Sequence, residues 1–146
     1  MSKITKTTRL LSRVTRKCVT RPDEAWLLMR MAWWVAVLSV TARCYSLPRA
    51  LEIVAGNRKH GRRSSASREE LARAIDQLLS VDVLIFKPIC WKRAAVLHRY
   101  LSQTRIIFGV RNESDGKFDG HAWLEADGRP ILESTPPDYV VTYSFP

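Results

Sequence analysis

Cys90 and His121 are the residues of this sequence whose types suggest nucleophilic chemistry, and Glu133 is an acid of the kind that orients an imidazole. A thiolate can attack a carbonyl carbon, an imidazole can take the thiol proton, and a carboxylate can hold the imidazole in place. Such a set works only if the fold brings its members together. The elements that carry these residues therefore decide whether a site exists.

The residues before Cys90 predict that this cysteine opens a helix. Pro88 disfavours a helical conformation in the residue before it and interrupts any helix arriving from upstream, so residues 90–102 are predicted as a new helix. The unpaired N–H groups of a first turn and the positive end of the helix dipole both favour a thiolate. Lys92 and Arg93 add positive charge within one turn.

Two strands are predicted after this helix. Residues 104–110 are rich in β-branched and aromatic side chains, and residues 120–126 alternate between two faces. The polar residues 112–119 are expected to connect them. In the second strand the face that carries His121 also carries Trp123 and Glu125, whereas the other face is apolar.

Residues 127–128, Asp-Gly, predict a hairpin into a third strand over residues 129–134, and its register decides which acid reaches His121. A two-residue turn would place Ser134 opposite His121. Glu133 would then lie on the apolar face. This register leaves the imidazole without a carboxylate partner.

A three-residue loop over residues 126–128 would instead pair Glu133 with His121 and Glu125 with Arg129. We favour this register because it gives an opposite-charge cross-strand pair and keeps Glu133 off the apolar face. It predicts a nucleophile, a base and an orienting carboxylate in one site.

The N-terminal half is predicted to be helical. Residues 1–21 are basic, lack acids and have apolar side chains at helical spacing, so we expect a basic amphipathic lead-in. The next helix, residues 23–43, is the most apolar segment, but its uncharged stretch is shorter than the ~20 residues that cross a bilayer. A buried helix is expected. The alternative is an exposed patch for a partner or a membrane interface, formed by Trp26, Trp33 and Trp34.

Two shorter helices complete this half. A proline in the first turn and a following Gly-Asn pair bracket residues 47–55, and Ser67 with Glu70 makes a capping box for residues 67–79. The basic and small residues 57–66 between them predict a loop.

The chain ends in a turn at residues 136–138 and a predicted edge strand, residues 139–143. Helices first and an antiparallel sheet second indicate the α+β class. A length of 146 residues with 46% hydrophobic content suits one domain, residues 1–146, with a helical region 1–80 and a core 81–146 that carries the site.

The charge and the cysteine count narrow the function classes. A net charge of +10 implies attraction to an anion, either nucleic acid, lipid or an acidic peptide. Cys18, Cys44 and Cys90 show no metal-ligand or disulfide spacing, so we expect no metal, no cofactor and a reducing cytoplasm. His60 and His98 have no partner spacing and are interpreted as structural or solvated.

Three motifs resemble a known family. These are CWKR at 90–93, IIFGVR at 106–111 and HAWLEADGRPILE at 121–133, which are similar to the leader peptidase of lasso-peptide biosynthesis, a transglutaminase-like cysteine peptidase. The resemblance covers the C-terminal half, while the N-terminal half is similar only in being helical.

The resemblance implies a role for each site residue. Cys90 is the nucleophile, His121 the general base, and Glu133 stands where the family carries its third acidic member. Many members have Asp at that position. Asp127 is therefore the reserve candidate for the third role, although its place in the turn explains it better.

The resemblance also implies partners. The peptidase removes the leader from a ribosomally made precursor, and an ATP-using lasso cyclase closes the ring. Residues 1–80 lack a predicted strand pair for the family's leader-recognition domain, so we expect a separate leader-recognition protein, in a bacterial cytoplasm. We expect no nucleic-acid partner and no transmembrane span, and the tryptophan patch leaves peripheral membrane contact as an alternative. Two alternatives stay open: a basic adaptor for an acidic peptide or nucleic acid, and another thiol acyl-transferase of the transglutaminase-like class.

Overall fold

The computed structural model describes residues 22–56, 66–80, 90–112, 116–133 and 135–146. The predicted basic lead-in, Cys18, His60 and most of the basic loop lie outside the described residues. The helices are α2 (Pro22–Cys44), α3 (Leu47–Ala55), α4 (Arg68–Leu79) and α5 (Cys90–Tyr100), followed by the strands β1 (Arg105–Asn112), β2 (Phe118–Ala126), β3 (Arg129–Ile131) and β4 (Val140–Phe145). This order confirms the predicted α+β class.

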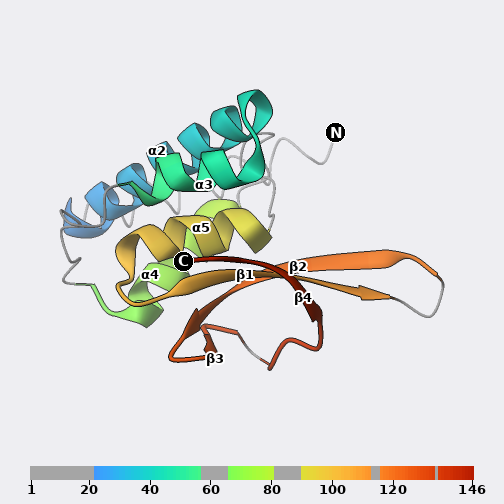
Figure 1. Ribbon diagram of the computed structural model, residues 1–146. Helices are drawn as coiled ribbons and strands as arrows, with labels where there is room; N and C mark the ends of the chain where they lie inside the picture. Colours follow the sequence, from blue (N-terminus) through green and yellow to red (C-terminus); the bar gives the residue numbers. More distant parts are fainter. Residues whose placement is uncertain (1–21, 57–65, 81–89, 113–115, 134) are drawn as a thin grey trace, which may run out of the picture.

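The helix α5 lies between the other helices and the sheet (Figure 1). It contacts α2, α3 and α4 among the helices and β1 and β2 in the sheet. Its buried residues Ala94 to Leu97 join the core cluster that also includes Ile106 and Leu124 from the sheet. The helix that begins at Cys90 is therefore held from both sides.

The helix boundaries follow the local sequence signals. Ser67 accepts a hydrogen bond from the Glu70 N–H at 3.2 Å, and the Glu70 carboxylate accepts one from the Ser67 N–H at 2.9 Å. The predicted capping box is thus present at the start of α4. Gly56 ends α3 with a φ of 63°, a conformation that glycine adopts at low cost.

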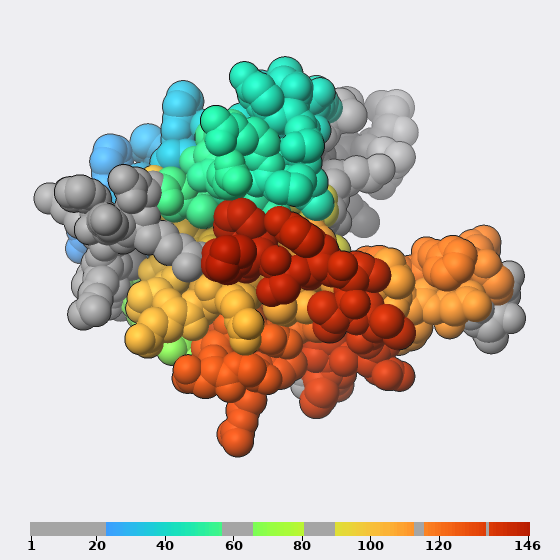
Figure 2. Space-filling view, in the orientation of Figure 1, coloured from blue at the N-terminus to red at the C-terminus, as the bar shows by residue number. Residues whose placement is uncertain are grey.

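The four strands form one antiparallel sheet in the order β3-β2-β1-β4. The predicted edge strand is β4, which pairs with β1 and runs across the front of the molecule in Figure 2. The β1–β2 ribbon extends beyond the helices, as Figure 1 shows, and Phe118 there is 78% exposed. The sheet therefore reaches past the core that the helices cover.

The predicted hairpin register is wrong. Leu124 pairs with Ile131 and Ala126 with Arg129, so the turn has two residues and the third strand ends at Ile131, not at residue 134. Asp127 and Gly128 have φ values of 52° and 73°, the left-handed pair of a type I′ turn. This turn matches the twist of the strands, and its fit outweighs the charge pair on which the three-residue loop was based.

The apolar helix α2 has two different sides. Met31, Val35 and Leu38 are fully buried, as expected for a core helix, but Trp26 and Trp33 are 61% and 66% exposed. Trp34 is partly buried, with the Arg99 guanidinium 3.6 Å from its ring centroid. Residues 23–44 are long and apolar enough to cross a membrane by length and composition, a test that the core helix of a soluble protein also meets.

Candidate active site

Cys90 is the first residue of α5 and lies beside an open stretch of β2. The short strand β3 pairs only with residues 124–126, so β2 has no β3 partner near His121. The Cys90 Sγ lies 4.0 Å from the Gly120 carbonyl oxygen, and the residue is partly buried. The early end of β3 thus leaves room for the thiol at the edge of the strand that carries His121.

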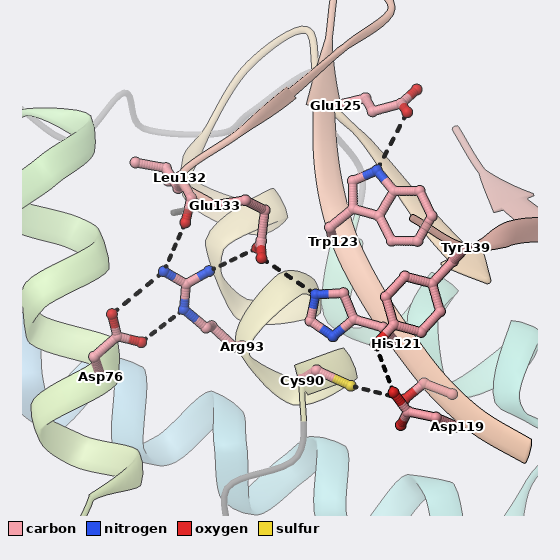
Figure 3. A network of polar contacts seen from close by, with 11 residues as sticks. Asp76, Cys90, Arg93, Asp119, His121, Trp123, Glu125, Leu132, Glu133 and Tyr139 are labelled. Carbon is pink, nitrogen blue, oxygen red and sulfur yellow. Dashed lines mark hydrogen bonds and ion pairs between the residues drawn. The ribbon is translucent and has the colours of Figure 1, made fainter. Parts of the chain in front are cut away.

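His121 has a different neighbour on each side of its ring. Its Nε2 lies 3.2 Å from Glu133 Oε2, and Figure 3 shows the second ring nitrogen on the side that faces the Cys90 sulfur. An ionised carboxylate only accepts hydrogen bonds, so the neutral tautomer that fits this contact carries its proton on Nε2 and leaves the lone pair on Nδ1. The ring is therefore arranged to take a proton from the thiol.

Glu133 reaches His121 by a route that the sequence did not predict. In the observed register a straight strand would direct Glu133 to the apolar face, away from the imidazole. Leu132 instead has a φ of 60°, which ends β3 and turns the chain. Only 18% of the Glu133 side chain is exposed. The structure thus brings Cys90, His121 and Glu133 together through a bend rather than through strand pairing.

Arg93 holds the segment after β3. Its Nη1 lies 3.3 Å from Glu133 Oε1, and its Nη2 donates to the Leu132 carbonyl at 3.1 Å. Its Nε and Nη2 lie 2.6 and 3.3 Å from the two carboxylate oxygens of Asp76 on α4 (Figure 3). Sequence reasoning gave Arg93 only a general positive charge. Its spacing of three from Cys90, which puts both on one helix face, is the signal that was missed.

Two aromatic side chains pack against the His121 ring. The ring centroids of Tyr139 and Trp123 lie 5.4 and 6.0 Å from that of His121. Gly109 pairs with His121 across the sheet, and a Cβ there would lie 2.7 Å from Tyr139 Cβ and 3.0 Å from the Trp123 ring. Glycine inside a strand indicates such close approach, so this position could have been read from the sequence.

Tyr139 also connects to a charged pair beside the thiol. Its hydroxyl donates to Asp119 Oδ2 at 2.6 Å, and Arg111 lies 3.1 Å from the same oxygen. The hydrogen bond to Asp119 raises the pKa of the Tyr139 hydroxyl, because it stabilises the protonated form. Neither Tyr139 nor Asp119 was predicted as part of the site.

The remaining candidates lie elsewhere. Asp127 is exposed in the hairpin turn, ~20 Å from His121 along the strand. Cys44 is exposed at the end of α2. His98 is buried, with its Nδ1 3.0 Å from the Thr104 hydroxyl. Within the described ranges, no cluster of His, Cys, Asp and Glu side chains is arranged to hold a metal ion.

Comparison with known families agrees with this geometry. The sequence profile described as the transglutaminase-like superfamily matches residues 34–144. The chain belongs to the transglutaminase-like superfamily. The match begins in α2, so the superfamily domain of this chain includes α3 and α4 as well as α5 and the sheet. No curated protein and no solved structure matches the chain significantly.

Proposed function

We propose that this chain is a cysteine peptidase that removes the leader peptide from a ribosomally synthesised lasso-peptide precursor. The observation that carries the proposal is the 3.2 Å contact between His121 Nε2 and Glu133 Oε2, together with the Cys90 thiol at the start of a helix, 4.0 Å from the carbonyl oxygen of the adjacent Gly120. The motifs at 90–93, 106–111 and 121–133, which resemble the lasso leader peptidases, support the substrate class.

In the proposed reaction the Cys90 sulfur attacks the carbonyl carbon at the end of the leader. His121 takes the thiol proton on Nδ1, a carbon–sulfur bond forms, and the carbon–nitrogen bond breaks as His121 returns the proton to the departing amine. Water then attacks the thioester, with His121 as the base, and releases the leader carboxylate and the thiol. Backbone N–H groups at the start of α5 are suitable donors for the oxyanion.

The proposed activity uses no metal and no cofactor, because thiol, imidazole and carboxylate supply the nucleophile, the base and the orientation. We also propose a separate leader-recognition protein as partner and a lasso cyclase as the next enzyme, in a bacterial cytoplasm. In support, the described parts of residues 1–80 are the helices α2, α3 and α4 with their connections, and they contain no strand pair.

The second candidate is another thiol acyl-transferase of the transglutaminase-like class, which the superfamily match itself favours. It would use the same Cys90 thioester and differ only in the acceptor, an amine in place of water. The nature of the product therefore separates the two functions.

Mass spectrometry of candidate precursor peptides, incubated with the protein and a leader-recognition partner, tests the proposal. Wild type should release leader and core as two peptides that together gain one water, and Cys90→Ala should release neither. Cys44→Ala is the matched control, because that thiol is exposed on α2 outside the site, and it should cleave as wild type does. A product joined to an added amine would instead indicate the transferase.

A further inference from the structure

The position of Glu133 needs an explanation that the sheet does not give. Strand pairing ends at Ile131, and the next residue, Leu132, has a left-handed φ of 60°. This conformation is unfavourable for leucine and persists only where surrounding contacts fix it. The contacts that fix the bend are therefore the ones that aim Glu133.

The Leu132 side chain packs against the core, and the polar contacts at the bend come from one side chain of α5, Arg93. All three guanidinium nitrogens of Arg93 are used: two meet the Asp76 carboxylate, one of these also meets the Leu132 carbonyl, and the third meets Glu133 Oε1. The Arg93 and Glu133 side chains are 23% and 18% exposed, so this ion pair is partly shielded from water, whereas the Asp76 side chain is 51% exposed. Glu133 keeps its other oxygen for His121 Nε2.

We propose that Arg93 is a positioning residue, which holds the bend at Leu132 and directs the Glu133 carboxylate to His121, and that Asp76 fixes the guanidinium. This role rests on the proposed function of the site and deepens it. Arg93 acts through Glu133 and His121, and it touches neither the thiol nor the scissile bond.

The geometry requires arginine at this position. The planar guanidinium offers donors in fixed directions, so it can bind two carboxylates and a carbonyl at once. Lysine would keep the charge but reduce it to one ammonium group, which cannot span Asp76, Leu132 and Glu133 together. Arg93→Lys therefore tests the geometry separately from the charge.

The test compares Arg93→Gln, Arg93→Lys, Glu133→Gln and the double variant Arg93→Gln/Glu133→Gln. One readout is the rate of Cys90 alkylation by iodoacetamide as a function of pH, and another is the set of ¹⁵N shifts of the His121 ring, which report which nitrogen carries the proton. Neither requires a peptide substrate. Arg73→Gln is the matched control, since it removes one positive charge from an exposed site on α4.

We expect Arg93→Gln to slow Cys90 alkylation near neutral pH by about 10- to 100-fold, as misplacement of a catalytic group does, and to move the His121 proton off Nε2. Arg93→Lys should slow Cys90 alkylation nearly as much as Arg93→Gln does, and Arg73→Gln should leave the alkylation rate at the wild-type value. The double variant should be no slower than Glu133→Gln alone, because Arg93 acts through that carboxylate.

Two results would overturn the role. In the first, Arg93→Gln lowers the melting temperature but leaves alkylation and the His121 shifts unchanged. In the second, the losses of the two single variants multiply in the double variant. If Arg93→Gln does not fold, Arg93→Lys and Asp76→Asn carry the same comparison. Slower alkylation in a protein that cleaves no leader would keep the positioning role and reject the proposed substrate.

Discussion

Glu133 divides its two carboxylate oxygens between two neighbours, His121 Nε2 at 3.2 Å and Arg93 Nη1 at 3.3 Å. The orientation of the imidazole therefore depends on a carboxylate that is itself held by a cation. A single substitution that removes the charge of one of these side chains but keeps its volume separates the effect of the charge from the effect of packing.

Glu133→Gln keeps the volume and removes the charge that orients the imidazole. We expect leader cleavage to fall by about 10²-fold or more, with the fold intact, as found when an orienting carboxylate becomes an amide. Asp127→Asn should leave cleavage unchanged, because Asp127 is exposed in the turn. Loss of cleavage in Asp127→Asn but not in Glu133→Gln would assign the third role to the turn. Initial rates and thermal melts on both variants measure this.

The Tyr139 hydroxyl makes the free energy of unfolding vary with pH in the alkaline range. The pKa of Tyr139 in the folded protein lies above the usual value of about 10. Its hydrogen bond to Asp119 therefore contributes fully to the free energy of unfolding below pH ~10, and this contribution is lost as the pH rises through the raised pKa. Tyr139→Phe should be less stable than wild type at neutral pH, and the difference should shrink at high pH. Burial raises the pKa of Tyr100 as well, so the comparison is made on the difference between the two melting curves. A constant difference would contradict the assignment.

Sequence reasoning found the neighbours of the candidate site but not the way they meet. The Cys90 helix start and the alternation around His121 are local patterns and were visible in the sequence. The bend at Leu132 depends on Arg93 and Asp76, which are 39 and 56 residues away along the chain, and no local rule reports such contacts. The proximity of Glu133 to His121 was therefore expected from a register that does not occur.

At the scale of elements, the hairpin and the central strand pair set the frame of the site. The β1–β2 register places Gly109 opposite His121, and the type I′ turn fixes where β3 begins. Each of these features depends on a glycine. Gly109 leaves room for the Tyr139 and Trp123 side chains, and Gly128 adopts the left-handed conformation that the turn requires.

Gly109→Ala should disturb the two aromatic side chains that pack against the His121 ring. The added Cβ would lie 2.7 Å from Tyr139 Cβ, a distance that Cβ atoms essentially never show, and 3.0 Å from the Trp123 ring, which is tighter than most such contacts. The neighbouring groups must therefore shift. We expect a loss of about 1–3 kcal/mol in the free energy of unfolding, typical of overpacking, with slower Cys90 alkylation. Gly120→Ala is the matched control for stability alone, since its Cβ would meet open space. Urea melts on both variants measure the difference.

Gly128→Ala should destabilise the hairpin without touching the site. A Cβ at a φ of 73° is strained even in open space, so we expect a loss of about 1 kcal/mol or more in the free energy of unfolding. Asp127→Asn should have little effect, because Asn also tolerates the left-handed region. If Gly128→Ala melts like wild type, the type I′ turn is incorrect.

At the scale of the molecule, α5 joins a layer of helices to the sheet, and the outer side of α2 stays exposed. The capping box, the short helices and the helix-then-sheet order were predicted because each depends on local sequence. The sequence left open whether α2 is buried or presents an exposed tryptophan patch, and the helix does both. Its apolar residues surround the helix, and only tertiary contacts decide which of them are buried.

The exposed tryptophans of α2 should drive association. Trp26→Gln combined with Trp33→Gln should reduce self-association in sedimentation while leaving the melting temperature nearly unchanged, because both side chains are more than half exposed. Trp34→Ala should instead lower the free energy of unfolding by about 2 kcal/mol or more, since Trp34 packs against the core and Arg99. A monomer that sediments identically with and without these changes would favour α2 as an ordinary surface helix.

The helix α5 carries Cys90 and also Arg93, which holds Glu133, while His121 stands on the sheet. Any sliding of α5 along β2 therefore displaces the thiol and the carboxylate in the same step, and the imidazole loses both neighbours together. Loosening of this one contact therefore removes the base from the thiol and the orienting carboxylate from the base together. Cys90 then keeps only the local influence of the helix start.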